Sequence, residues 1–282
     1  MRLKQPGEMI LDTSTAITSQ SKRWRLSLAL RASLLVHAAA AVMLTAHPEA
    51  WPWALGVLGA NHLVLFVAVL WPRGQLLGPN LVCLPPPAVR RREIALTFDD
   101  GPDPEVTPRV LDLLDRFEAK ASFFCVGEKS AAYPALVKEI ARRGHSVENH
   151  SYHHYLAFAF FGISRLKREV DAAQATVAAI TGRPPVFFRA PAGFRSPLLD
   201  PALASRGLRY VSWTRRGFDA VSGNPKRILR QLTRGLAAGD VLLMHDRVPV
   251  VLAVLPALLE QISAQGLNAV SLVSACADEP VE

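Results

Sequence analysis

The sequence predicts an α/β fold in which parallel strands form a barrel, preceded by an N-terminal pair of apolar helices. Three observations predict this arrangement. Strand-length apolar runs alternate with helix-length segments over residues 93–277. Several of those runs end in a polar or charged residue, as the strands of parallel barrels that carry function do. Residues 26–72 differ from the rest, because they hold two long stretches without Lys, Arg, Asp or Glu.

These two N-terminal stretches are long enough to cross a bilayer. Residues 32–48 and 50–72 lack charged side chains, and Trp residues lie at their edges, where indole rings favour the headgroup region. Basic residues precede the first stretch and follow the second, whereas the connection between them has no Lys or Arg. The positive-inside rule therefore predicts a transmembrane hairpin in the inner (cell) membrane, with the C-terminal domain in the cytoplasm. The alternative is a signal sequence or single anchor followed by an exported domain.

Four parts follow from this division. We expect a basic N-terminal tail over residues 1–25, a two-helix membrane anchor over 26–72, a stiff Pro-rich basic linker over 73–92 and an α/β domain over 93–277. Within the domain, helices are expected at 107–119, 134–143, 164–181, 197–206, 225–237 and 249–265. Strands are expected at 122–126 and 269–272, besides those that carry the motifs below.

The composition narrows the class of protein. The 282 residues are half hydrophobic and carry a formal net charge of +8. Such a basic balance often marks nucleic-acid-binding proteins, but no module of interleaved aromatic and basic residues is present. We therefore expect the basic residues to interact with a membrane surface and not with a nucleic acid. Three scattered cysteines, Cys83, Cys125 and Cys276, form no disulfide framework and favour a reducing compartment.

Two short motifs carry the chemistry. Asp99 and Asp100 end an apolar strand, and His150 and His154 follow another strand about fifty residues later. One carboxylate and two imidazoles can hold a divalent metal with open positions for water and substrate. The second carboxylate is then free to act as a base. Taken singly, an Asp-Asp-Gly-Pro segment is usually a turn and a His-x-x-x-His segment usually a surface or core pair. Their order and their positions at strand ends favour a metal-assisted hydrolase.

Three further polar residues follow apolar runs of strand length. Arg189 follows a strand at 186–188, Asp219 lies six residues after Trp213, and His245 ends a strand that starts after Gly239. Each could have a purely structural role, as an ion-pair partner, a turn residue or a histidine capped by Asp246. Because the carboxyl ends of parallel strands share one edge of a barrel, we expect them in one site.

In this order, the five segments resemble the motifs of the polysaccharide deacetylases, the NodB-homology group of carbohydrate esterases. The resemblance covers about two-thirds of the chain and implies an irregular barrel of about seven strands. With the N-terminal hairpin, the chain is expected to be a membrane-anchored member. It implies a base, a residue that holds the base, three metal ligands, a general acid and a residue that orients this acid. By their positions in the motifs, the base is Asp99 and the residue that holds it is Arg189. The metal ligands are Asp100, His150 and His154. The general acid is His245, and Asp219 orients it.

One segment departs from the family pattern. Arg216 and Ala220 stand where many relatives carry Asp and Trp, which puts the role of Asp219 in question and implies a differently shaped pocket wall. The ligand set of one oxygen and two nitrogens favours zinc as the cofactor. The resemblance then implies that Asp99 takes a proton from water, that a backbone N–H helps to stabilise the oxyanion, and that His245 protonates the departing nitrogen.

The expected activity is metal-dependent hydrolysis of the N-acyl group, most simply N-acetyl, of an amino sugar in a polysaccharide or lipid-linked glycan. A cytoplasmic domain favours a lipid-linked acceptor, whereas an exported one favours peptidoglycan or an exopolysaccharide. Two alternatives stay open. The chain could be a deformylase acting on a lipid-linked amino sugar, or a catalytically silent sugar-binding membrane scaffold.

An apolar stretch over residues 155–161 directly follows His154 and shows neither a helical nor a strand period. It either packs into the core beneath the site or forms an apolar lip that meets lipid beside it. His153, next to the second predicted ligand, is expected to face solvent or the pocket rim.

Overall fold

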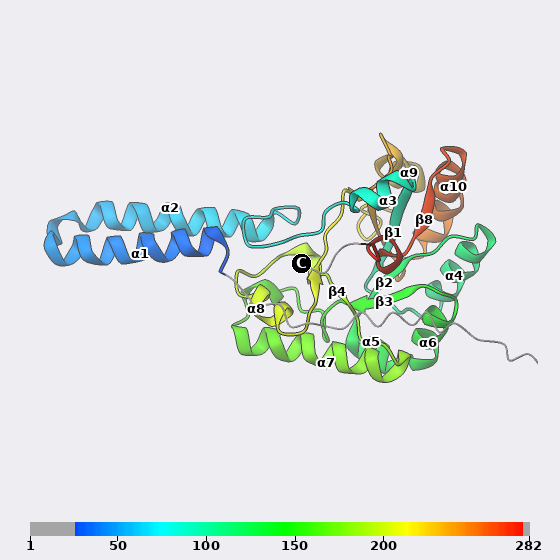
Figure 1. Cartoon of the computed structure of the whole chain (residues 1–282), viewed down its shortest axis with the longest axis horizontal. Coiled ribbons are helices and arrows are strands. Elements are labelled where there is room, and N and C mark those ends of the chain that lie inside the picture. The colour runs from blue at the N-terminus through cyan, green and yellow to red at the C-terminus, as the bar shows by residue number, and fades with distance from the viewer. Residues whose placement is uncertain (1–25, 279–282) are drawn as a thin grey trace, which may run out of the picture.

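A computed structural model, which describes residues 26–278, shows a curled half-barrel of parallel strands with a helical hairpin projecting from it (Figure 1). The strands lie in the order β5-β4-β3-β2-β1-β7-β6, and β8 pairs with the first half of β1. All pairings between the named strands are parallel. The predicted α/β class and the parallel barrel of about seven strands are thus confirmed.

The strands are short, and most are buried. Their bounds are β1 Glu93–Asp99, β2 Ser122–Cys125, β3 Ser146–Asn149, β4 Phe187–Phe188, β5 Arg209–Tyr210, β6 Arg215–Arg216, β7 Val241–His245 and β8 Asn268–Val270. The central strand β1 is buried along its whole length, because helices and neighbouring loops cover both of its faces. Strand β6 was not predicted from the sequence, since two arginines do not produce an apolar run.

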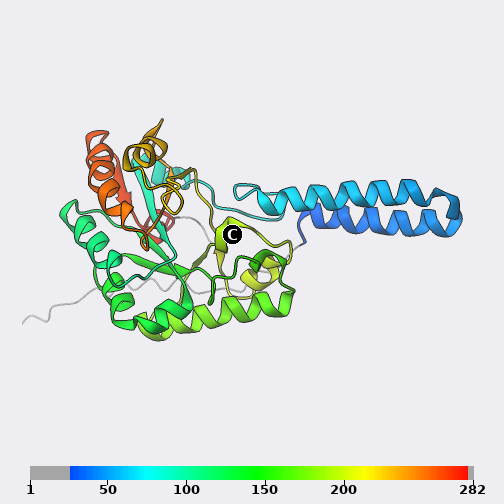
Figure 2. The same ribbon diagram turned by 180° about the vertical axis from the view of Figure 1, so that it is seen from behind.

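Helices pack around the outside of the sheet and join consecutive strands (Figures 1 and 2). Their bounds in the α/β domain are α4 Val106–Arg116, α5 Gly127–Ala132, α6 Pro134–Arg142, α7 Ile163–Thr181, α8 Leu199–Ala204, α9 Pro225–Thr233, α10 Val250–Ala264 and α11 Leu272–Ala275, with 3₁₀ turns η2 Phe158–Phe160 and η3 Pro191–Gly193. The six helices predicted from the sequence match α4, α6, α7, α8, α9 and α10. The helices α5 and α11 are too short to show the helical periodicity of apolar residues from which a helix can be predicted.

Two apolar helices form the N-terminal hairpin. Helix α1 (Leu28–Ala46) and helix α2 (Trp51–Leu70), joined by the 3₁₀ turn η1 (Pro48–Ala50), are long and apolar enough to cross a membrane. They lie side by side in both views and project away from the barrel, with their connecting turn at the far end (Figures 1 and 2). Asn61 donates a hydrogen bond of 2.9 Å to the Ser33 hydroxyl, which joins the two helices between their apolar faces. The expected tail over residues 1–25 lies outside the described residues.

The Pro-rich segment after the hairpin packs closely against the sheet. Its prolines begin a short helix, α3 (Pro86–Arg90), because Pro is favoured in the first turn of a helix. Leu84 and Ala88 are buried in an apolar cluster that includes residues of β1, β2 and β7. The backbone N–H of Leu81 also bonds to the carbonyl oxygen of Tyr210. These contacts fix the end of the hairpin relative to the barrel.

Candidate metal and acid-base site

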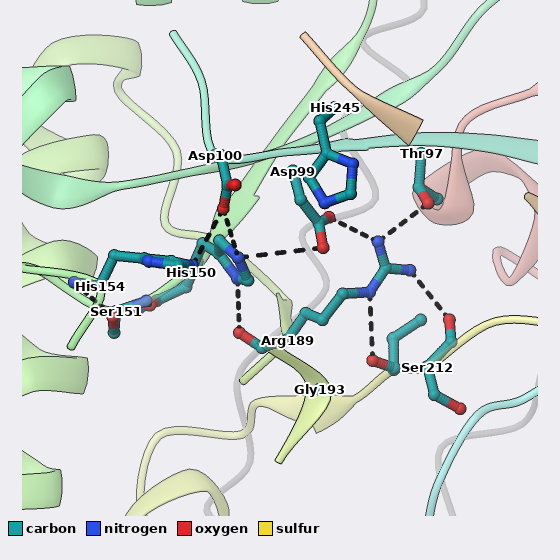
Figure 3. Close-up of polar contacts among 12 residues, drawn as sticks. Thr97, Asp99, Asp100, His150, Ser151, His154, Arg189, Gly193, Ser212 and His245 are labelled. Atoms are coloured by element: carbon teal, nitrogen blue, oxygen red, sulfur yellow. Dashed lines mark hydrogen bonds and ion pairs between the residues drawn. The ribbon is translucent and has the colours of Figure 1, made fainter. Parts of the chain in front are cut away.

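The polar residues that follow the motif strands meet at the carboxyl edge of the sheet. Asp99 at the end of β1 is the register partner of His245 at the end of β7. On the other side of β1, β3 and β4 are paired through Asn149 and Phe188, the residues directly before His150 and Arg189. One edge of the half-barrel therefore presents a carboxylate, a guanidinium and two imidazoles from strands far apart in sequence (Figure 3).

One carboxylate and two imidazoles converge closely enough to share a cation. The Nε2 atoms of His150 and His154 lie 3.3 Å and 2.9 Å from the same oxygen of Asp100. One ligand atom from each of the three residues lies within 4.8 Å of the other two. The Nδ1–H of His150 donates to the carbonyl oxygen of Arg189 at 2.8 Å, which leaves the Nε2 lone pair facing Asp100. Such an arrangement can hold a divalent metal.

Left-handed backbone conformations aim these side chains. Asp100, Ser151 and His154 have φ angles of 72°, 62° and 54°, a region that non-glycine residues adopt rarely. Local hydrogen bonds hold the strained loop: the Ser151 hydroxyl accepts from the His154 N–H, and the Asn149 side chain accepts from the Ser151 N–H. Such strain, which costs about 1–3 kcal/mol per residue, clusters at functional sites.

Asp99 is held beside this group by Arg189. The Nη1 atom of Arg189 donates to Asp99 Oδ1 at 2.6 Å and to the Thr97 hydroxyl at 2.9 Å. Its Nη2 atom donates to the Ser212 carbonyl oxygen at 2.9 Å. The guanidinium is fully buried and lies over the Phe124 ring. Figure 3 shows Asp99 between Arg189 and the Asp100–His150–His154 group. The second Asp99 oxygen, which Arg189 does not engage, is 3.9 Å from His150 Nε2.

His245 pairs with Asp219 and not with its neighbour Asp246. Asp219 accepts from the backbone N–H of His245 at 2.7 Å, and its other oxygen lies 3.0 Å from Nδ1. Burial alone would lower the pKa of His245, but the hydrogen bond and charge of Asp219 outweigh it and raise that pKa above its ordinary value. Asp246 instead accepts a hydrogen bond from the Thr107 hydroxyl, and burial raises its pKa to about 7.

Asp100 carries a further partner that the sequence did not indicate. The Nε–H of Arg247 donates to Asp100 Oδ2 at 2.7 Å, on the oxygen that the two imidazoles do not approach. Burial raises the pKa of Asp100, but the hydrogen bonds and charges of His150 and His154 reverse this and hold it far below its usual range. Only its position two residues after His245 could have drawn attention to Arg247.

One small pocket of about 140 Å³ lies at this site, and its charged lining residues include Asp99, Asp100, His150, His154, His245 and Arg247. Its wall combines the charged group with an apolar side formed by residues such as Leu156, Trp213 and Leu243. Arg216 and Ala220, where the sequence departs from the family pattern, both line it. Gly193 lines it too, with a φ of +76°, and an added Cβ there would meet the Trp213 ring at 2.5 Å. A larger residue at 193 would therefore displace the Trp213 wall.

The apolar stretch after His154 is partly buried and partly exposed. Phe158 is fully buried and packs against Phe188, whereas Leu156 and Phe160 are 76% and 67% exposed. His153 turns away from the metal group and bonds to Glu169 through its backbone N–H and Nδ1, at 2.9 Å and 2.8 Å. Its side chain is exposed, as expected.

The hairpin ends beside this pocket. The backbone N–H of Arg195 donates to the carbonyl oxygen of Val69 near the end of α2, at 3.3 Å. Ala159, in η2, packs in one cluster with Ala68 and Val69. The segment around η3 and the segment that carries the exposed Leu156 and Phe160 therefore both adjoin the base of the hairpin.

Known proteins match this chain over the same region. Residues 87–211 match the family model described as polysaccharide deacetylase. A peptidoglycan-N-acetylglucosamine deacetylase of Bacillus cereus is 32% identical over 155 residues, which cover 54% of this chain and 72% of that protein. A chitooligosaccharide deacetylase of Azorhizobium caulinodans is 32% identical over 157 residues, 55% of this chain and 74% of that protein.

Solved structures share the fold. A family 4 carbohydrate esterase from Streptomyces lividans, in complex with acetate, aligns with a TM-score of 0.60 at 31% identity, over 63% of this chain and 91% of that one. A peptidoglycan N-acetylglucosamine deacetylase bound to an N-hydroxybenzamide aligns with a TM-score of 0.65 at 28% identity, over 70% and 92% of the two chains. A pseudoenzyme from Bacillus anthracis has a TM-score of 0.64 at 20% identity, over 70% and 68% of the two chains, and shares the fold alone.

Proposed function

Because this chain belongs to the polysaccharide deacetylase family, we propose that it hydrolyses the N-acetyl group of an amino sugar in a glycan, with a bound metal. The observation that carries the proposal is the convergence of Asp100, His150 and His154 beside the Asp99–Arg189 pair. The matched relatives are named as deacetylases of peptidoglycan and of chitooligosaccharides, which makes N-acetylglucosamine the sugar to test first.

Zinc is the proposed cofactor, held by Asp100, His150 and His154. Three donors that include two imidazoles suit zinc and leave coordination positions open. The hydrogen bond from His150 Nδ1 to a carbonyl oxygen is the kind of outer contact that orients a metal-binding imidazole. When bound, such a metal polarises the amide carbonyl and lowers the pKa of water.

The other side chains supply proton transfer and alignment. Asp99 is the proposed base, and the buried Arg189 holds its carboxylate in the pocket by a hydrogen bond. His245 is the proposed acid, because an amide nitrogen must gain a proton before it can leave as an amine. Asp219 supports that task by holding one tautomer of His245 and favouring its protonated form.

We propose the inner membrane as the location, with the hairpin as the anchor and the catalytic domain in the cytoplasm. The division into a tail (1–25), an anchor (26–72), a linker (73–92) and a deacetylase domain (93–277) belongs to this proposal. Its support is the length of both apolar helices and the basic residues that follow them, Arg73 and Arg90–Arg92. An exported domain on a single anchor is the competing arrangement.

A lipid-linked acceptor suits this arrangement best. The pocket lies close to the end of α2, and the apolar Leu156 and Phe160 are exposed near it. A glycan carried by a membrane lipid would therefore meet the site without leaving the bilayer surface. A formyl group would need the same base, acid and metal, so the acid released distinguishes a deacetylase from a deformylase.

The test is acid release by the purified full chain in detergent. N-acetylated chito-oligomers and lipid-linked N-acetylglucosamine should both yield acetate, and a chelator should abolish the release until zinc is restored. The Asp99→Asn variant should be nearly inactive. Activity that persists after chelation, or in Asp99→Asn, would refute the mechanism. A folded, metal-loaded chain that releases neither acetate nor formate would favour the silent scaffold.

A further inference from the structure

In the part of the chain that the structure describes, Arg216 is a cation in the pocket wall without an acidic partner. Within residues 26–278 no carboxylate lies at ion-pair distance from its guanidinium, and its Nε atom is buried without a hydrogen-bond acceptor. The guanidinium lies 5.3 Å from the Trp213 ring and 5.0 Å from the Phe218 ring. Aromatic rings position the cation but do not accept the N–H hydrogen bonds that it can make.

The neighbouring Arg215, unlike Arg216, has hydrogen-bond partners for all three guanidinium nitrogens. Arg215 donates from Nε to Asp240 at 2.5 Å and from its other two nitrogens to the carbonyl oxygens of Arg234 and Gly235. Both arginines form β6, which is paired in register with Leu242 and Leu243 of β7. Successive residues of a strand point to opposite faces, so the same strand directs one arginine to the surface network and the other to the pocket.

A second arginine, Arg247, lines the same pocket, and not all of its N–H groups have hydrogen-bond acceptors among the described residues. Arg247 uses its Nε–H to bond to Asp100, and its side chain is 43% exposed. The carboxylates of the pocket already have partners: Asp99 bonds to Arg189, and Asp100 contacts His150, His154 and Arg247. The positive charge of Arg216 is therefore left for a group that comes from outside the described chain.

We propose that Arg216, supported by Arg247, forms an oxyanion subsite that binds a phosphate group on the amino-sugar substrate. This inference rests on the proposed function and names the class of its substrate, a glycosyl phosphate or diphosphate. A guanidinium matches two oxygens of a phosphate at once, and a phosphate offers further oxygens to a second guanidinium. The phosphate could come from a free sugar phosphate or from the diphosphate of a lipid carrier.

The test compares three substrates with the full-length protein in detergent micelles. They are a neutral N-acetylated chito-oligomer, N-acetylglucosamine 1-phosphate, and polyprenyl-diphosphate-linked N-acetylglucosamine. The expected effect of Arg216→Gln is a loss of kcat/KM that is about tenfold greater for the two phosphorylated substrates than for the neutral one. Arg216→Lys keeps the positive charge but cannot bond to two phosphate oxygens at once. Its kcat/KM for the phosphorylated substrates should lie between those of the wild type and Arg216→Gln.

Arg109→Gln is the matched control, because Arg109 is exposed on α4 and does not line the pocket. It should leave the substrate preference as in wild type. An Arg216→Gln variant that loses the same factor on all three substrates would overturn the subsite. The effect should appear with both phosphorylated substrates. A larger effect with the lipid-linked substrate identifies the diphosphate as the preferred ligand, and an equal effect shows that a single phosphate is sufficient.

Binding separates this inference from the catalytic proposal. Titration calorimetry on the Asp99→Asn background, where turnover should be absent, compares N-acetylglucosamine 1-phosphate with the methyl glycoside of the same sugar. Tighter binding of the phosphate that is lost on adding Arg216→Gln supports the subsite even if the wild-type protein hydrolyses nothing. Equal binding of the two sugars to the protein with Arg216 intact overturns the subsite, whether or not the chain is a deacetylase and whether or not Arg216→Gln folds.

Discussion

The carboxylate of Asp219 contacts His245 twice, through the backbone N–H at 2.7 Å and through Nδ1 at 3.0 Å. The first contact fixes the carboxylate at the end of β7, and the second fixes the ring. A histidine held in this way has Nε2 as its free atom, which suits an acid whose proton must go to the substrate. Asp219 therefore acts on the protonation of His245 as well as on its position.

Replacing Asp219 with Asn should shift the pH dependence of kcat. Asp219 raises the pKa of His245, so the acid stays protonated to higher pH in the wild-type protein. Without the negative charge this pKa falls, and the basic limb of the kcat profile should move to lower pH. The rate–pH profile of Asp219→Asn, with the exposed Asp112→Asn as control, measures this. An unmoved basic limb would show that His245 is not the acid.

Adjacent carboxylates should respond differently to the same substitution. Asp99 is bonded to Arg189 and is not part of the ligand group, so Asp99→Asn should keep its metal and lose activity by about 10²–10⁴-fold. Asp100→Asn should lose the metal itself, because the two imidazoles would retain only a weaker oxygen donor. Metal content by plasma mass spectrometry, measured beside activity, separates the two roles. Equal loss of metal in both variants would contradict the assignment.

Much of this site could be predicted from the order of the motifs, because Asp99, His150, Arg189 and His245 each end or directly follow an apolar run with strand character. In parallel sheets such positions share an edge, so Asp99 and His245 could be brought together without any structural information. This rule did not predict the pairing of Asp219 with His245, because Asp219 lies six residues beyond the strand-like run that ends at Trp213. Its loop is determined by tertiary contacts.

The local sequence pattern did not predict the other parts of the pocket. Arg247 follows a motif histidine but lies beyond the strand, and its contact with Asp100 depends on how two loops approach each other. The apolar run after His154 has no period, so the opposite exposures of Phe158 and Phe160 could not be assigned in advance. The packing of Leu84 against the sheet was not predicted, because a Pro-rich, basic segment is typical of an exposed linker.

His145 should make the stability of the fold depend on acid pH. Burial lowers its pKa to about 4. Its Nδ1 accepts from the Ala121 N–H, and its Nε2 is buried without a hydrogen-bond partner among residues 26–278. The unfolded chain binds a proton more tightly between its ordinary pKa of 6.5 and about 4, so stability falls as the pH drops through this window. The loss should be on the order of 2–3 kcal/mol.

Denaturant unfolding of the full chain at pH 7 and pH 4.5 measures this loss. His145→Gln should reduce the difference between the two pH values, because the amide does not titrate. His47→Gln, at an exposed position in the hairpin turn, should leave the difference as in wild type. A His145→Gln variant with the full wild-type pH dependence would assign the loss to other groups.

Reporter fusions should give the orientation of the hairpin. A periplasm-active reporter fused after Pro48 should be active, and the same reporter after Glu282 should be inactive, because the basic residues favour the cytoplasm for both ends. A cytoplasm-active reporter should give the reverse pattern and controls for expression. Periplasmic activity at Glu282 would place the catalytic domain outside and redirect the search for substrate to peptidoglycan or an exopolysaccharide.

The exposed apolar residues beside the pocket should matter only for a substrate in a membrane. Leu156→Ser and Phe160→Ser remove side chains that are mostly exposed, so neither should change the free energy of unfolding by more than about 0.5 kcal/mol. Both should lower kcat/KM for polyprenyl-linked N-acetylglucosamine in vesicles and leave that for a soluble chito-oligomer within about twofold. Phe158→Ser is the matched contrast, because Phe158 is fully buried against Phe188 and its loss should cost about 3–5 kcal/mol of stability. Equal loss on vesicle-bound and soluble substrates in Phe160→Ser would show that this surface does not meet the bilayer.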